Sequence, residues 1–236
     1  MPADRRPGWL LDEVASAGRE NLDQLHVSQY DTKEDADAAA EVARCRQWGL
    51  TPEATVVEFG AGTGQFTLAV ASWCARVVAV DVSPVMLQRL RTKVGEAGAA
   101  NVEVVEAGFL TYEHQGPPAD LVYSRYALHH LPDFWKGVAL RRIRDLLRPG
   151  GVLRLWDVVY SFEPADAERR IEQWCATADG DGAEEWSRVE LEEHVRDEHS
   201  TFTWLLEPMA QRAGFVVEEA TYSDDAVFAQ YVLRRS

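Results

Sequence analysis

The chain has 236 residues, 46% of them hydrophobic, which suffices for one compact domain with its own core and argues against a disordered chain. Its 39 acidic and 24 basic residues give a net charge of −15, so the surface should on average repel nucleic acid. The three cysteines match no metal spacing or disulfide framework, and no apolar stretch is long enough to cross a membrane, so we expect a cytoplasmic protein that contacts neither nucleic acid nor membrane.

The first 50 residues have a helical pattern. The sequence Thr32-Lys33-Glu34-Asp35 is similar to a capping box, and Gly49 is a stop signal. We expect residues 1–50 to form a helical lid segment over the functional site.

From residue 51 to residue 159, short apolar runs alternate with helical patterns. Ser83 is expected to cap one of these helices, with Pro84 at its first position. Asp133 is a candidate cap for the next helix, and Pro149-Gly150-Gly151 is expected to end that helix. Continuous apolar runs between helices are typical of parallel strands that are buried on both faces. The runs are residues 55–57, 77–80, 102–105, 121–123 and 152–155. The pattern predicts an α/β fold with a doubly wound sheet of five parallel strands.

Residues 160–200 interrupt this alternation. Between Ser161 and Ser200 there are 13 acidic and 4 basic residues, together with Trp174 and Trp186. Charged residues with spaced aromatics indicate an amphipathic helical insertion rather than a linker. Residues 201–236 then predict a last helix that ends at Gly214 and two antiparallel strands, 215–220 and 227–234, that complete the sheet.

A glycine-rich turn follows the first apolar run, in the sequence Glu58-Phe59-Gly60-Ala61-Gly62-Thr63-Gly64. Glycines there let the backbone turn sharply and let a ligand press on the main chain, while the next helix points its amides at the ligand. The fingerprint for dinucleotides requires G-x-G-x-x-G, and Gln65 or Thr67 stands where its third glycine should be. The acid-x-G-x-G-x-G pattern resembles motif I of the class I S-adenosylmethionine-dependent methyltransferases.

This resemblance covers roughly residues 30–235. The run that ends at Asp81 looks like the family's second strand, whose terminal acid binds the two ribose hydroxyls; residues 120–124 resemble motif IV, and residues 147–151 the turn before the fifth strand. The resemblance implies a Rossmann-like fold and S-adenosyl-L-methionine as cofactor. The residues that it assigns to the cofactor site are Tyr30, Glu58, Gly60, Gly62, Gly64, Asp81, Val82, Met86, Gly108, Phe109, Ser124 and Arg125.

One position departs from the family pattern. Many relatives carry Gly-Asp after the third strand, where the aspartate binds the adenine amino group, whereas this chain has Glu106-Ala107-Gly108-Phe109. We therefore expect adenine to be bound by backbone groups at Gly108 and Phe109 and by stacking. Two of the assigned residues have a structural alternative, since Met86 and Tyr30 could equally pack in a helix interface.

His129 and His130 are the candidates for a general base. They are adjacent, so they point in different directions, and they lack the spacing of a zinc site, for which reason we expect no metal. Arg125 could pair with a carboxylate of cofactor or substrate, or with a surface acid.

The expected function is methyl transfer to a small-molecule acceptor through an oxygen, nitrogen or carbon nucleophile, by in-line displacement. The lid segment and the acidic insertion would build the acceptor pocket, with aromatics available for its lining at Tyr126, Trp156, Tyr160, Phe162, Trp174 and Trp204. Two alternatives stay open: a nucleic-acid or protein methyltransferase, and a non-catalytic cofactor-binding partner subunit. The oligomeric state also stays open.

Overall fold

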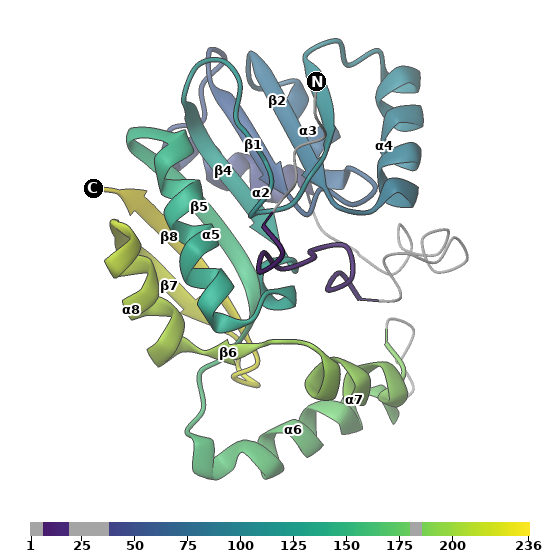
Figure 1. Ribbon diagram of the computed structural model, residues 1–236, viewed down its shortest axis with the longest axis vertical. Helices are drawn as coiled ribbons and strands as arrows, with labels where there is room; N and C mark the ends of the chain where they lie inside the picture. Colours follow the sequence, from purple (N-terminus) through teal and green to yellow (C-terminus); the bar gives the residue numbers. More distant parts are fainter. Residues whose placement is uncertain (1–6, 19–37, 180–185) are drawn as a thin grey trace.

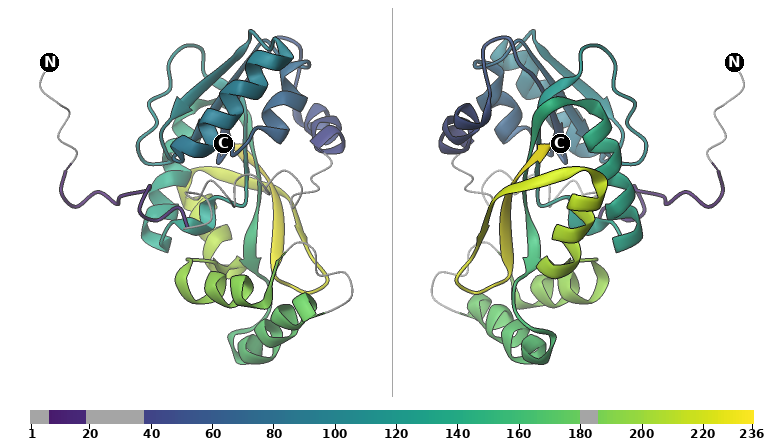
Figure 2. Two further views of the ribbon diagram at one scale, coloured as in Figure 1. Left: turned by 90° about the vertical axis from the view of Figure 1, so that its right-hand side faces the viewer. Right: turned by 90° about the vertical axis from the view of Figure 1, so that its left-hand side faces the viewer.

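The computed structural model describes residues 7–18, 38–179 and 186–236. Within these residues a single sheet runs through the molecule and carries helices on both faces (Figures 1 and 2). The strands are β1 (Thr55–Phe59), β2 (Arg76–Asp81), β3 (Val102–Glu106), β4 (Ala119–Arg125), β5 (Leu147–Tyr160), β6 (Thr201–Phe202), β7 (Phe215–Tyr222) and β8 (Phe228–Arg235).

The strand order is β3-β2-β1-β4-β5-β8-β7, and the two-residue β6 pairs with the end of β5. Strands β1 to β5 are parallel to one another, whereas β8 is antiparallel to both β5 and β7. The α/β fold with five parallel strands and a C-terminal antiparallel pair is therefore confirmed. Strands β3 and β7 form the two edges, and each carries two carboxylates, Glu103 and Glu106 on β3 and Glu218 and Glu219 on β7.

The α-helices are α2 (Ala38–Cys45), α3 (Gln65–Ala71), α4 (Pro84–Ala97), α5 (Asp133–Leu146), α6 (Ala167–Ala176), α7 (Arg188–Asp197) and α8 (Thr203–Ala213). Alternate strand residues point to opposite faces, so Val57 and Val80 pack with α5 and α8, whereas Val56 and Val77 pack with α2 and α3. Helix α4 covers Ala79 on the second of these faces. Burial on both faces explains why the parallel strands are continuous apolar runs rather than alternating ones.

Three local expectations were wrong. Residues 7–18 form turns and bends instead of a helix. Pro149-Gly150-Gly151 does not stop the helix, because α5 already ends at Leu146 and these residues belong to β5, which pairs Leu147 with Ala119 of β4. Asp133 is the first residue of α5 rather than its cap, and its carboxylate bonds the Lys136 ammonium at 2.9 Å and the Thr201 hydroxyl at 3.2 Å.

The acidic insertion forms helices α6 and α7 beyond the end of β5, at the lower end of Figure 1. Trp174 of α6 and Leu191 of α7 are buried against Tyr160, the last residue of β5, and Phe162, which follows it, so the insertion has a small aromatic core. None of the helices in the described residues is long and apolar enough to span a membrane.

Candidate functional site

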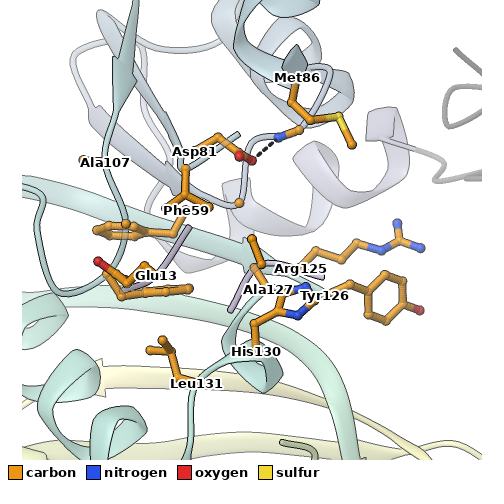
Figure 3. Close-up of a pocket in the computed structure, with 16 residues that line it drawn as sticks. Glu13, Phe59, Asp81, Met86, Ala107, Arg125, Tyr126, Ala127, His130 and Leu131 are labelled. Carbon is orange, nitrogen blue, oxygen red and sulfur yellow. Dashed lines mark hydrogen bonds between the residues drawn. The ribbon is translucent and has the colours of Figure 1, made fainter. Parts of the chain in front are cut away.

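A pocket opens where β1, β2 and β4 end, beside the loop that follows β3 (Figure 3). The empty space between its walls is about 630 Å³ when the solvent at its open mouth is included. Ligands of open α/β sheets bind at this carboxyl edge. The lining residues are Glu13, Ala17, Phe59, Gly60, Gly62, Asp81, Val82, Met86, Ala107, Gly108, Phe109, Arg125, Tyr126, Ala127, His130 and Leu131.

The glycine-rich turn forms the wall of the pocket after β1. Gly60 and Gly62 have φ of +70° and +53°, a region that side chains disfavour. A Cβ on Gly60 would also overlap the Cβ of Ala127, which lies directly beside Gly60 in the segment after the neighbouring strand β4. Gly64 lies outside the lining, with φ of +90°, and a Cβ there would overlap Leu90 of α4. The glycines thus let this wall approach both the ligand space and the neighbouring helix.

Asp81 stands at the end of β2 and faces the pocket. Its Oδ2 accepts a hydrogen bond from Gly62 N, and its Oδ1 accepts one from Ser83 N, both at 2.8 Å (Figure 3 shows the contact with the turn). Burial raises the pKa of Asp81, while the backbone donors oppose that shift. The carboxylate is held in one orientation, and a carboxylate so placed can accept two hydrogen bonds from a vicinal diol.

Glu58, in contrast, lies outside the pocket lining. It is 4% exposed, and its carboxyl group accepts a short hydrogen bond from the Thr67 hydroxyl of α3. Burial raises its pKa to about 8, so Glu58 is mostly protonated at neutral pH. Its side chain links the end of β1 to α3, the helix that follows the glycine-rich turn. Ser124 is likewise fully buried at the end of β4 and does not line the pocket.

The loop after β3 forms the opposite wall. Gly108 and Phe109 line the pocket, and Phe109 stacks on Phe59 with ring centroids 4.8 Å apart. Met86 also lines the pocket although the residue is only 1% exposed. It therefore packs in the interior and contributes to the pocket wall at the same time.

Glu13 was missed by the sequence analysis. This residue of the N-terminal segment is 8% exposed, and its carboxylate accepts hydrogen bonds from Leu110 N and the Thr111 hydroxyl, both at 3.0 Å. No pattern around residue 13 signals such a role. Tyr30, the other expected site residue of this segment, lies outside the described residues.

Arg125 is the last residue of β4 and Tyr126 follows it, and both lie on the side of the pocket away from Glu13 (Figure 3). Tyr126 has a φ of +50°, an uncommon conformation for a side chain of its size and one that tends to occur at functional sites. The guanidinium of Arg125 lies 3.9 Å from the ring centroid of Trp156, a cation–π contact that orients the arginine.

The two histidine candidates have different environments. His130 lines the pocket, whereas His129 is 5% exposed and lies between two carboxylates. Its Nδ1 makes a short contact with Asp157, and its Nε2 lies 2.9 Å from Glu198 Oε2. Although burial opposes the charged ring, these carboxylates raise the pKa of His129 to about 10. His129 is therefore charged at neutral pH and lies outside the pocket lining, which favours His130 as the candidate that faces a substrate.

Burial and the neighbouring His129 charge lower the pKa of His130 to about 3. His130 is therefore a neutral imidazole that can accept or donate a hydrogen bond but is a weak base. His194 also contacts Glu198, at 2.6 Å, so His129, His194 and Glu198 bring three possible metal ligands within 4.8 Å of one another. The histidine nitrogens lie 2.6 and 2.9 Å from Glu198 Oε2, which are hydrogen-bond distances. We therefore interpret the cluster as a hydrogen-bonded network that fixes the turn that carries His130.

The pocket fits S-adenosylmethionine on three observations. Asp81 offers an oriented carboxylate for a ribose diol, and the wall at Gly60 has space only for a residue without Cβ. Met86 and Phe109 provide apolar surface beside them for a purine. Of the expected cofactor residues, the structure brings together at one pocket Gly60, Gly62, Asp81, Val82, Met86, Gly108, Phe109 and Arg125.

Comparison with known proteins finds methyltransferases as relatives. Residues 56–151 match the family described as "Methyltransferase domain". An uncharacterized methyltransferase of Geobacillus sp. (strain WCH70) is 28% identical over 169 residues, which cover 66% of this chain and 78% of the relative.

Solved structures share the fold at low identity. A SAM-dependent methyltransferase from Aquifex aeolicus has a TM-score of 0.60 at 17% identity, over 91% of this chain and 99% of its own. Magnesium protoporphyrin IX methyltransferase from Synechocystis PCC 6803, solved with bound SAH, has a TM-score of 0.61 at 16% identity. The match covers 90% of this chain and 86% of that protein. Residues 56–151 therefore form a methyltransferase domain, and the chain is a methyltransferase that uses S-adenosylmethionine as its cofactor.

Proposed function

We propose that the enzyme methylates a small molecule at an oxygen, nitrogen or carbon nucleophile by in-line displacement. The observation that carries this proposal is the extent of the pocket, which continues from Asp81 to Tyr126, His130 and Leu131. A concave site with apolar and aromatic lining suits a modest-sized acceptor better than an extended polymer.

The insertion supports an enclosed acceptor space. Tyr126 packs at 5.8 Å from Phe228, and Trp174 of α6 packs at 6.0 Å from the same ring, so the aromatic core of the insertion begins where the pocket ends. Tyr160 and Phe162 belong to this core as well, whereas Trp204 is 52% exposed and contributes nothing to the lining. Such a cover excludes water from the reacting groups.

The chemistry supplied by bound S-adenosylmethionine is an electrophilic methyl group, so the protein's own task is to bind and align. Asp81, the glycine-rich turn and Arg125 hold and orient one partner, and holding both partners in line supplies most of the acceleration. His130 is neutral and weakly basic, which favours acceptors that arrive with a free lone pair over those that need a strong base.

Other acceptors have less support. The net charge of −15, and the acidic insertion beside the pocket, oppose a polyanion. The three cysteines are free and buried, which fits the cytoplasmic location that we also propose.

The test is methyl transfer from labelled S-adenosylmethionine into a cell extract, followed by separation of small molecules from acid-precipitable protein and nucleic acid. We expect label in the small-molecule fraction with the wild type and none with Asp81→Ala. Label confined to protein or RNA would replace the proposal by the macromolecular alternative. No transfer by a protein that still binds the cofactor would favour the non-catalytic partner subunit.

A further inference from the structure

Gly108 and Glu13 fit together in an unusual way. A Cβ built on Gly108 would lie 2.6 Å from Oε2 of Glu13 and closer still to its Oε1 and Cδ. The carboxyl group of Glu13 therefore occupies the space that a side chain at position 108 would fill. Gly108 is not among the glycines with positive φ, so its backbone conformation is open to any residue. The absence of a side chain there makes room for a carboxylate from elsewhere in the chain.

The carboxylate of Glu13 is held firmly in that space. Leu110 N and the Thr111 hydroxyl each donate to a different oxygen of it, at 3.0 Å, and the residue is 8% exposed. Thr111 also accepts a hydrogen bond from Gly108 N at 2.8 Å, which ties the loop to the same group. A carboxylate has about four acceptor positions, so it can bond a ligand donor in addition to these protein donors.

The position of Glu13 identifies the end of the cofactor that it faces. Within the part of the chain that the structure describes, Glu13 and Asp81 are the two acidic side chains of the pocket lining. Asp81 ends β2, and Glu13 lies beyond it, over the loop after the outer strand β3, whereas the glycine-rich turn and Arg125 lie on the other side, at β1 and β4. A ribose bound at Asp81 carries the purine on one side and the amino-acid part on the other. The purine therefore falls on the side of Glu13, beside Phe109.

We propose that Glu13 accepts a hydrogen bond from the exocyclic amino group of adenine, and that the N-terminal segment thus supplies the carboxylate that the loop after β3 lacks. Recognition of the base then depends on the docking of residues 7–18 against this loop. Leu10 and Leu11 of the segment pack on the main core, which holds Glu13 in place. The alternative role for the same carboxylate is to obstruct the pocket, and the two roles predict opposite effects of its removal.

The experiment is calorimetric titration with S-adenosylhomocysteine and with its inosine counterpart, in which an oxygen replaces the amino group. A carboxylate accepts a hydrogen bond from the amino group of adenine but repels the oxygen of the inosine ligand. The wild type should therefore bind the adenine ligand about 10- to 100-fold more tightly. Glu13→Ala should weaken the adenine ligand by a similar factor and lose the preference. Glu106→Gln, which changes an exposed carboxylate outside the pocket at the end of β3, directly before this loop, should leave both affinities unchanged.

A double variant makes the test decisive. Glu13→Ala with Gly108→Asp returns a carboxylate to nearly the same place from the other chain segment, and it should restore the preference for adenine. If Glu13→Ala weakened both ligands equally and Gly108→Asp restored neither, Glu13 would only anchor the segment and the proposal would be wrong. Tighter binding by Glu13→Ala would show obstruction and would equally overturn it. The readout is binding, so it is independent of the acceptor that the enzyme methylates.

Discussion

Asp157 of β5 holds His129 at two points. Its Oδ2 accepts a hydrogen bond from the backbone N of His129 at 3.0 Å, and its Oδ1 meets the imidazole Nδ1. The turn that follows β4 is thereby fixed to the neighbouring strand. His130 and Leu131, the next two residues, line the pocket, so this buried contact positions them.

The first prediction concerns the protonation of the two adjacent histidines. At pH of about 7, His129 should be an imidazolium and His130 a neutral imidazole, because their pKa values are about 10 and about 3. Nitrogen chemical shifts of ¹⁵N-histidine-labelled protein report these states directly, and His129→Gln and His130→Gln assign the signals. A His130 ring that titrates near pH 6.5 would contradict the assignment and return it to the role of general base.

A second prediction concerns the stability of the His129 network. The raised pKa of His129 means that its contribution is complete below its unfolded value of 6.5 and is lost as the pH rises through about 10. The lowered pKa of Glu198 means that its contribution is present above 4.5 and is lost as the pH falls. Both contributions are complete between pH 4.5 and pH 6.5, so His129→Gln should lower the unfolding free energy most in that interval, by about 3–5 kcal/mol. Urea unfolding at several pH values measures it, and a difference that does not shrink toward pH 10 would refute the cause.

Glu58 gives the third prediction. Its pKa is raised from 4.5 to about 8, so its neutral form stabilises the fold below pH 4.5 and this contribution is lost as the pH rises through 8. Glu58→Gln retains a neutral polar group that can still bond Thr67. The variant should therefore gain stability relative to the wild type as the pH increases over that interval. A relative stability that stays constant with pH would show that Glu58 is already ionised in the folded protein.

The fourth prediction compares two glycines with similar backbones. Gly60 and Gly98 have φ of +70° and +62°, but a Cβ on Gly60 would overlap Ala127, whereas nothing lies within 4 Å at Gly98. Both alanine variants should lose about 1 kcal/mol through backbone strain. Gly60→Ala should lose about 1–3 kcal/mol more and should also lose the thermal stabilisation by S-adenosylhomocysteine. Equal losses and intact binding in both variants would show that the close approach at Gly60 is unimportant.

The parallel core could be predicted from sequence because its signals are local. Strands β1, β2 and β4 each contain a short apolar run, and Ser83 does cap α4, since its hydroxyl accepts a hydrogen bond from Met86 N at 3.2 Å. Proline and glycine usually end a helix, but at Pro149-Gly150-Gly151 they lie inside β5, where Leu147 pairs with β4 on one side of them and Val152 pairs with β4 and β8 on the other. Tertiary pairing there overrides local preference.

The site was predictable where its residues follow strands and was not where they come from distant segments. Gly60 directly follows β1, Asp81 ends β2, and Gly108 comes two residues after β3, so the sequence places them at one edge. Glu13 bonds Leu110 across 97 positions of sequence, and His129 depends on Asp157, 28 positions later. The adjacency of His129 and His130 indicated that they diverge, but only the packing of β5 decides which ring faces the pocket.

The two edge strands bear on how the molecule behaves in crowded solution. An exposed edge offers unpaired backbone groups to a neighbour, yet Glu103 and Glu106 at one edge and Glu218 and Glu219 at the other would meet like charges on a second copy. A bulge between Val217 and Glu219 further breaks the regular edge of β7. Mutual repulsion should keep concentrated protein dispersed at neutral pH and should fade as acid brings the chain toward its isoelectric point of about 4.8, where light scattering would register the onset of aggregation.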